Sequence, residues 1–192
     1  MKKLIFPFFL LLIIFILSFL VFSDQNIIST NKTNEDEMLY KKFQLLSRNG
    51  NSSCSSSFAN SISSMSGQAR LQGSCCGPMG WHRYKEQVKS LKRYINIKEI
   101  PPDPYDIELK LAQKLQSHYN DPLSKKEQEA YDYAMQNSKE KGPCCCKCWR
   151  WNVYGGLAKY LIKNYKFTGR QITDVWNLSD GCGGDEDHVA HS

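Results

Sequence analysis

Half of the cysteines in this 192-residue chain lie within five consecutive residues. They stand in the stretch Gly142-Pro-Cys-Cys-Cys-Lys-Cys-Trp149. Pairing these sulfurs with one another would require strained short-range bridges, so the stretch needs other partners. Two further cysteine loops, Cys75-Cys76 and Cys182, bracket the intervening chain and can fold back onto it. The cysteines therefore limit the chain to folds in which distant loops meet.

The first 23 residues form a targeting or anchoring segment. Lys2 and Lys3 precede the apolar run from Leu4 to Phe22, which is interrupted only by Pro7 and Ser18. A helix of that length reaches about 28 Å, close to the hydrocarbon thickness of a bilayer. We favour an uncleaved membrane-spanning helix over a cleaved signal peptide, which would release a secreted protein. The two lysines keep the N-terminus in the cytoplasm and put the remaining chain outside it.

Three segments follow this anchor. Residues 24–70 are rich in Ser and Asn and predict a disordered tether, with one short helix near residues 38–46. Residues 71–184 form the cysteine-rich domain, and residues 185–192 form an acidic tail. Cys54 lies in the tether, where it is either a loose thiol or a partner for one other cysteine.

The domain is predicted to be an all-α, compact bundle of about five short helices. Apolar residues recur at three- and four-residue steps in each of five stretches. The stretches run from Trp81 to Ile95, Asp103 to Tyr119, Ser124 to Lys141, the cysteine cluster to Ile162, and Thr168 to Leu178. Asp103 with Pro104 would start the second, and the third and fifth begin with capping boxes. The fourth is apolar on two sides and so central, and its Gly155-Gly156 pair suits close approach by another helix. We expect no strand outside the membrane segment.

The cysteines leave three kinds of chemistry open. In the first, they bind a soft ion, Cu(I) or Zn²⁺, through the candidate ligands Cys75, Cys76, Cys144, Cys145, Cys146, Cys148 and Cys182. In the second, they are disulfides that hold a structural or interaction module together in an oxidising compartment, without a cofactor. In the third, Cys145 and Cys148 form a C-x-x-C redox pair, although no βαβ pattern accompanies it. Metal binding and bridging are equally open, and redox exchange comes third.

Other functions are excluded by the absence of their motifs. The C-x-x-C is followed by Trp149 and not His, so haem attachment is not encoded. There is no zinc-protease motif, phosphate loop or nucleophile elbow, and we predict that the protein is not an enzyme unless thiol–disulfide exchange counts as one. The formal net charge of +6 comes without a nucleic-acid-binding motif, so no nucleic-acid partner is expected. The expected partners are the membrane and a metal ion, and protein partners are unknown.

The motif Pro143-Cys144-Cys145-Cys146-Lys147-Cys148 resembles the signature of the small secreted bacterial proteins named for Pro-Cys-Tyr-Cys-Gly-Cys. Cys144, Cys146 and Cys148 would match the three cysteines of that signature, while Cys145 replaces its Tyr and Lys147 its Gly. The resemblance covers residues 142–183. The family is of unassigned function and usually lipid-anchored, and this chain lacks the N-terminal cysteine for such an anchor. The resemblance implies an extracytoplasmic cysteine module.

Overall fold

The computed structural model describes residues 34–67 and 69–184, and the chain divides into one unit of residues 1–42 and a second of residues 43–192. The predicted anchor at residues 1–23 and the acidic tail at residues 185–192 lie outside the described residues. Within the described part, no helix has both the length and the apolar character needed to cross a membrane. In the first unit, residues 34–42 are helical, and Lys41 pairs with Glu37 at 2.7 Å.

The second unit begins earlier than the sequence predicts. Residues 43–48 are helical and belong to the short helix predicted near residues 38–46, whereas helix α2 (Ser56–Ser61) lies in the part that was expected to be disordered tether. Leu46 and Ile62 are buried, and the Phe43 ring lies 5.5 Å from that of Trp81. The prediction is wrong here because a few apolar residues spaced through a polar segment bury enough surface to order it.

A small antiparallel sheet, also not predicted, joins β1 (Arg70–Gln72) to β2 (Asp106–Glu108). The buried residues Leu71 and Ile107 face each other across the two strands. On the other face, Arg70 Nε lies 2.5 Å from Asp106 Oδ1. Each strand is three residues long, so its period of two is too short to be recognised in the sequence.

The rest of the second unit is mostly helical, with one helix in each of the five predicted stretches. They are α3 (Trp81–Leu91, followed by the 3₁₀ turn η1, Lys92–Tyr94), α4 (Leu109–Ser117), α5 (Lys125–Asn137), α6 (Trp149–Tyr165) and α7 (Gly169–Ser179). The capping boxes predicted at Ser124–Glu127 and Thr168–Gln171 are both present. The sequence therefore predicts the number and order of these helices correctly.

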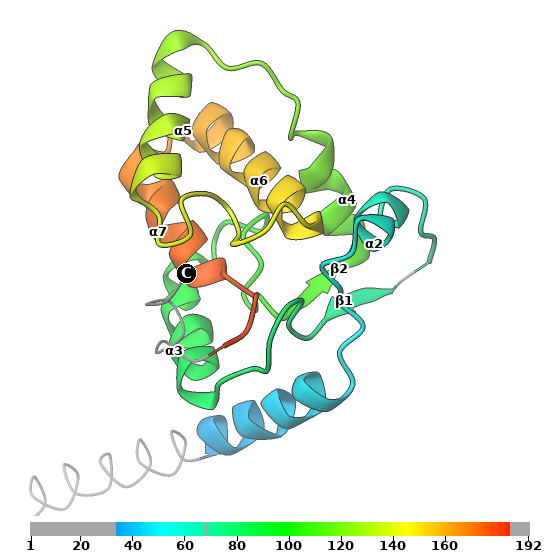
Figure 1. Cartoon of the computed structure of the whole chain (residues 1–192). Helices are drawn as coiled ribbons and strands as arrows, with labels where there is room; N and C mark the ends of the chain where they lie inside the picture. Colours follow the sequence, from blue (N-terminus) through cyan, green and yellow to red (C-terminus); the bar gives the residue numbers. More distant parts are fainter. Residues whose placement is uncertain (1–33, 68, 185–192) are drawn as a thin grey trace, which may run out of the picture. The chain divides into compact units, whose positions relative to one another are not determined.

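Helix α6 is the centre of the core, as its two apolar faces predict. It lies between α4 on one side and α5 and α7 on the other, and α2 contacts its start (Figure 1). Val153 and Leu157 are fully buried, as is Tyr154, whose carbonyl accepts a hydrogen bond from Trp176 Nε1 at 3.0 Å. The helix is therefore held on several sides, and its first turn is fixed in position.

Two predicted helix starts are wrong, and both errors concern the candidate site. Helix α4 begins at Leu109 and not at Pro104, because residues 106–108 pair with β1 and Asp103 accepts a hydrogen bond from Tyr105 N at 2.9 Å. Helix α6 begins at Trp149 and not at Pro143, so that the cysteine stretch is a loop and Cys148 is the N-cap. In a helix, neighbouring cysteines would point to different faces, whereas a loop can turn them toward one place.

The glycine pair in α6 allows α4 to approach closely, as predicted. A Cβ atom at Gly156 would overlap the carbonyl oxygen of Leu115, and one at Gly155 would lie 2.8 Å from the ring of Tyr119. The first obstacle is the backbone of α4, which cannot shift without moving the whole helix, while the second is a half-buried side chain that can turn.

We predict that Gly156→Ala lowers the free energy of unfolding by about 2 kcal/mol or more. The overlap with the α4 backbone outweighs the gain in helix propensity, which is about 1 kcal/mol. Gly155→Ala is the matched control and loses less, because Tyr119 can move. Chemical denaturation of both variants measures the difference, and an equal loss in the two would contradict this account of the α4–α6 contact.

Candidate metal centre

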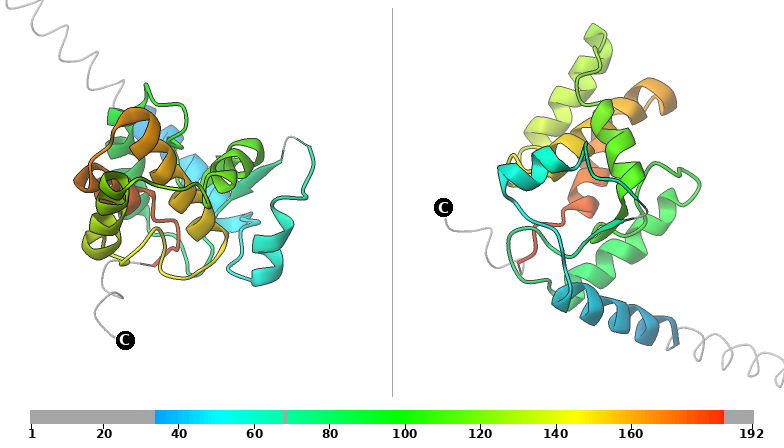
Figure 2. Two further views of the ribbon diagram at one scale, coloured as in Figure 1. Left: turned by 90° about the horizontal axis from the view of Figure 1, so that it is seen from above. Right: turned by 90° about the vertical axis from the view of Figure 1, so that its right-hand side faces the viewer.

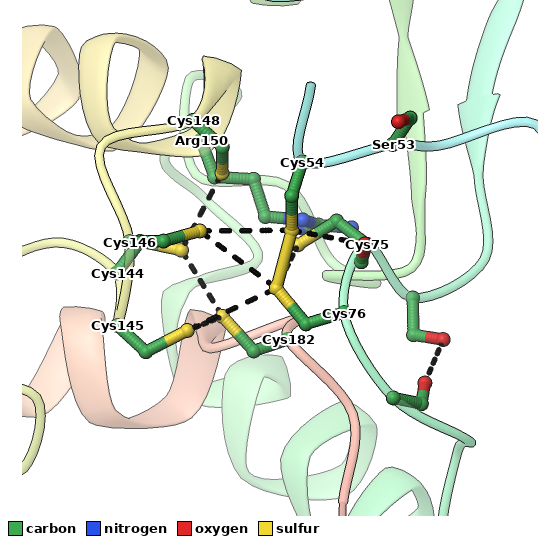
Figure 3. The surroundings of a disulfide bond; sticks show 12 residues. Ser53, Cys54, Cys75, Cys76, Cys144, Cys145, Cys146, Cys148, Arg150 and Cys182 are labelled. Atoms are coloured by element: carbon green, nitrogen blue, oxygen red, sulfur yellow. Dashed lines mark hydrogen bonds between the residues drawn. A yellow bond between two sulfur atoms is a disulfide. The ribbon is translucent and has the colours of Figure 1, made fainter. Parts of the chain in front are cut away.

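The eight cysteines of the chain come together in one place from four separate segments. Cys54 precedes α2, the Cys75-Cys76 loop follows β1, residues 144–148 precede α6, and Cys182 follows α7. Figure 3 shows their sulfur atoms pointing toward one another from these segments. The seven predicted ligands are therefore neighbours in space, together with Cys54, which was not among them.

Backbone hydrogen bonds pair the Cys75-Cys76 loop with the end of α7. Cys75 N donates to Gly181 O at 3.2 Å, and Cys76 N donates to Cys182 O at 3.1 Å. Asp180 ends α7 and accepts a hydrogen bond from Cys182 N at 3.1 Å, and its carboxylate also pairs with Arg83 of α3. Figure 2 shows the two segments running side by side. Cys75, Cys76 and Cys182 are thus positioned by main chain and not by side-chain flexibility.

The loop that carries Cys144 to Cys148 is held at both ends. At its start, buried Ser138 accepts a hydrogen bond from Gly142 N at 2.8 Å, and Lys139 N donates to Asn177 Oδ1 of α7 at 2.8 Å. At its end, Cys148 is the N-cap of α6. The cluster therefore lies at the N-terminal end of this central helix, where the helix dipole favours negative charge.

Cys54 forms a disulfide with Cys76. Its segment is tied to β1, since the backbone N–H groups of Asn51 and Ser52 both donate to Gln72 O at 3.0 Å. Ser52 also accepts a hydrogen bond from Trp149 Nε1 at 3.0 Å. Of the two alternatives left open for Cys54, a loose thiol or a partner for one other cysteine, the second is confirmed. The other six cysteines are free thiols.

Short sulfur–sulfur distances connect the free thiols with one another and with the disulfide. Cys182 Sγ lies 2.9 Å from Cys145 Sγ and 3.1 Å from Cys144 Sγ. Cys144 Sγ lies 3.7 Å from Cys148 Sγ, and Cys146 Sγ lies 3.6 Å from Cys54 Sγ. Three sulfurs bound to one ion at about 2.3 Å stand about 4 Å apart. The distances of 3.6 and 3.7 Å suit a shared ion, whereas those of 2.9 and 3.1 Å are shorter than such a site requires.

The sulfurs form five groups of three in which all three atoms lie within 4.8 Å of one another. These groups are Cys54/Cys146/Cys148, Cys54/Cys75/Cys76, Cys75/Cys144/Cys182, Cys76/Cys145/Cys182 and Cys144/Cys145/Cys146. Within residues 34–67 and 69–184, no group has four members, and none of the five includes a histidine or a carboxylate. None holds both Cys145 and Cys148, so the predicted C-x-x-C pair does not form one of these sites. His82, near the start of α3, is exposed.

The cluster has a buried side and an open side. Cys144, Cys148 and Cys182 are buried, whereas Cys76 and Cys145 are exposed. Hydrogen bonds from Cys144 lower the pKa of both the Cys75 and Cys182 thiols. The pKa of Cys144 itself is raised, because it donates to Cys148 and Cys182. Cys144 therefore favours ionisation of its two neighbours, Cys75 and Cys182.

Arg150 lies beside the sulfurs and is fully buried (Figure 3). Its Nη1 donates to Pro104 O at 2.5 Å and its Nη2 to Gly73 O at 3.0 Å, while Nε has no partner. Its positive charge contributes to the lowered pKa of Cys75. In the described part of the chain, no carboxylate forms an ion pair with Arg150, so thiolates are the nearby groups that can balance its charge.

No family model, no curated protein and no solved structure matches this chain. The resemblance of residues 142–183 to the Pro-Cys-Tyr-Cys-Gly-Cys proteins therefore stays a prediction. The structure supports a mostly helical, cysteine-rich module whose sulfurs lie within metal-binding distance.

We predict that Cys145 reacts slowly with alkylating agents near neutral pH despite its exposure. Partial withdrawal of its sulfur from water raises its pKa to about 11. Thiolate is the reactive form, so below this pKa the alkylation rate should rise about tenfold for each pH unit. Mass spectrometry of the metal-free protein after timed alkylation from pH 7 to 11 measures the rate. A rate at Cys145 that levels off below pH 9 would contradict the prediction.

Proposed function

We propose that this protein is a membrane-tethered, extracytoplasmic Cu(I)-binding protein without enzymatic activity. The observation that carries the proposal is the set of five overlapping three-sulfur groups. Thiolate is a soft ligand that favours Cu(I) and Zn²⁺. Zinc in structural sites takes four ligands, whereas three thiolates satisfy Cu(I), and no four-member group occurs among the described residues. The geometry therefore favours Cu(I) over Zn²⁺.

The charges around the cluster support the same proposal. A Cu(I) ion bound by three thiolates leaves an excess of negative charge. Buried Arg150 and the N-terminal end of α6 both stabilise such charge. A cluster of neutral thiols would leave Arg150 buried without an anion.

The proposed location rests on the sequence. The apolar run from Leu4 to Phe22 behind two lysines favours an anchor with the domain outside the cytoplasm. The Cys54–Cys76 disulfide agrees with an oxidising compartment.

A second candidate is a disulfide-stabilised structural module. One disulfide is present, and the 2.9 Å between the sulfurs of Cys145 and Cys182 would allow another to form with little movement. In that case the cysteines would carry no ion, and oxidation would leave few free thiols.

We predict that the full-length protein, purified in detergent without oxygen, retains Cu(I) through desalting. Cys144→Ser removes a sulfur shared by two of the five groups, and should weaken Cu(I) retention about tenfold or more against a chromophoric Cu(I) chelator. His82→Ala is the control and should leave retention unchanged, because His82 is exposed and outside these groups.

Elemental analysis, thiol counting and X-ray absorption separate the two candidates. Copper bound by sulfur alone supports the proposal. Protein that retains neither copper nor zinc while its six thiols stay free would refute metal binding. Protein with fully paired sulfurs and no metal would establish the structural module.

A further inference from the structure

The three-sulfur groups share most of their members. Seven of the eight cysteines each belong to two groups, and only Cys148 belongs to one. A thiolate has more than one lone pair and can bridge two Cu(I) ions. If each group held one ion, nearly every sulfur would be such a bridge. The arrangement is therefore that of one polynuclear cluster and not of independent sites.

The Cys54–Cys76 disulfide removes ligands from this cluster. A disulfide sulfur carries no negative charge and is not a thiolate ligand. Three of the five groups contain Cys54, Cys76 or both. The two that remain are Cys75/Cys144/Cys182 and Cys144/Cys145/Cys146, joined by the shared Cys144. In this state Cys148 belongs to no complete group.

We propose that the protein holds a polynuclear Cu(I)–thiolate cluster whose capacity is set by the Cys54–Cys76 disulfide. With the disulfide closed, two three-sulfur positions are complete. With it open, all five are complete. This inference rests on the proposed function, and it adds the number of ions and the bond that controls it.

A thiol or dithiol reductant converts the closed disulfide into two thiols. Its thiolate attacks the exposed sulfur of Cys76, and the Cys54–Cys76 bond breaks with transfer of two electrons to the two cysteines. The reductant leaves as a disulfide. The two thiols so formed release their protons to solvent when Cu(I) binds.

The sulfurs of Cys54 and Cys76 lie close to the sulfurs of other cysteines, so both can act as ligands once the disulfide is reduced. Cys76 Sγ lies 3.7 Å from Cys146 Sγ and 4.0 Å from Cys145 Sγ. Cys54 Sγ lies 3.6 Å from Cys146 Sγ. Reduction therefore frees two sulfurs that already lie close to the other members of three further groups.

The test is an oxygen-free Cu(I) titration of the full-length protein in two states. One sample keeps the disulfide, with six thiols by thiol counting; the other is reduced by a dithiol that is then removed, with eight thiols. We expect two tightly bound Cu(I) ions in the first state and five in the second. Equal capacities in the two states would overturn the inference, while the absence of tight Cu(I) binding in either state would overturn the proposed function itself.

Two variants test the assignment of groups. Cys148→Ser should leave the capacity of the disulfide state at two and lower that of the reduced state from five to four. The pair Cys54→Ser with Cys76→Ser should hold two ions whatever the treatment. Circular dichroism confirms that each variant keeps its helices, and a capacity that still rises on reduction of the double variant would contradict control by this disulfide.

Discussion

The buried guanidinium of Arg150 joins the helical core to the cysteine cluster, and several loops depend on it. Arg150 stands in the first turn of α6, and its guanidinium lies 4.5 Å from the ring centre of Trp149 and 5.9 Å from that of Tyr105. Its hydrogen bonds fix the carbonyls of Gly73 and Pro104, which belong to the chain after β1 and the chain before β2. One side chain thus sets the distance between the central helix and the Cys75-Cys76 loop.

The two backbone segments beside Arg150 each contain a glycine, Gly73 and Gly181, for different reasons. Gly73 has a positive φ of 79°, and a Cβ atom there would lie 2.6 Å from the Cα atom of Gly50. A Cβ atom at Gly181 would overlap the guanidinium of Arg150. Backbone therefore closes around the cation on both sides, and the loops that carry Cys75 and Cys182 cannot move away without exposing it. Burial of this charge costs free energy of desolvation unless anions lie next to it. The stability of the loops therefore depends on the charge state of the sulfurs.

The sequence predicts the features that depend on residues close together in the chain. It does not predict those that depend on contacts between residues far apart in the chain. The helices α3 to α7, their capping boxes and the role of Gly156 follow from periodicity and short-range chemistry. The pairing of β1 with β2 joins residues 36 positions apart, and no local pattern encodes it. The burial of Arg150 was not predicted, because arginine is usually exposed.

The candidate site likewise contains residues that the local sequence identifies and one residue that only distant contacts position. The stretch 144–148 was recognisable from its density of sulfur, and its convergence with Cys75, Cys76 and Cys182 was an expectation from their loop positions. Cys54 could not be placed, because its Ser-rich surroundings indicate disorder. Contacts with residues distant in the sequence order that segment, among them the burial of Leu46 and Ile62 and the hydrogen bonds of Asn51 and Ser52 to Gln72. Because the segment is ordered, Cys54 can form its disulfide with Cys76. The eight sulfurs are thereby divided into two bonded sulfurs and six free thiols.

The position of that disulfide matters as much as its chemistry. Cys76 and Cys145 are exposed, while Cys144, Cys148 and Cys182 are buried behind them. An ion that arrives from solvent therefore meets Cys145 and Cys76 before it reaches the buried sulfurs. With the disulfide closed, Cys145 is the exposed thiol on this path, and its raised pKa keeps it protonated near neutral pH. Opening the disulfide adds a second exposed sulfur at the same point, so the bond that limits the number of ligands also stands where an ion would enter.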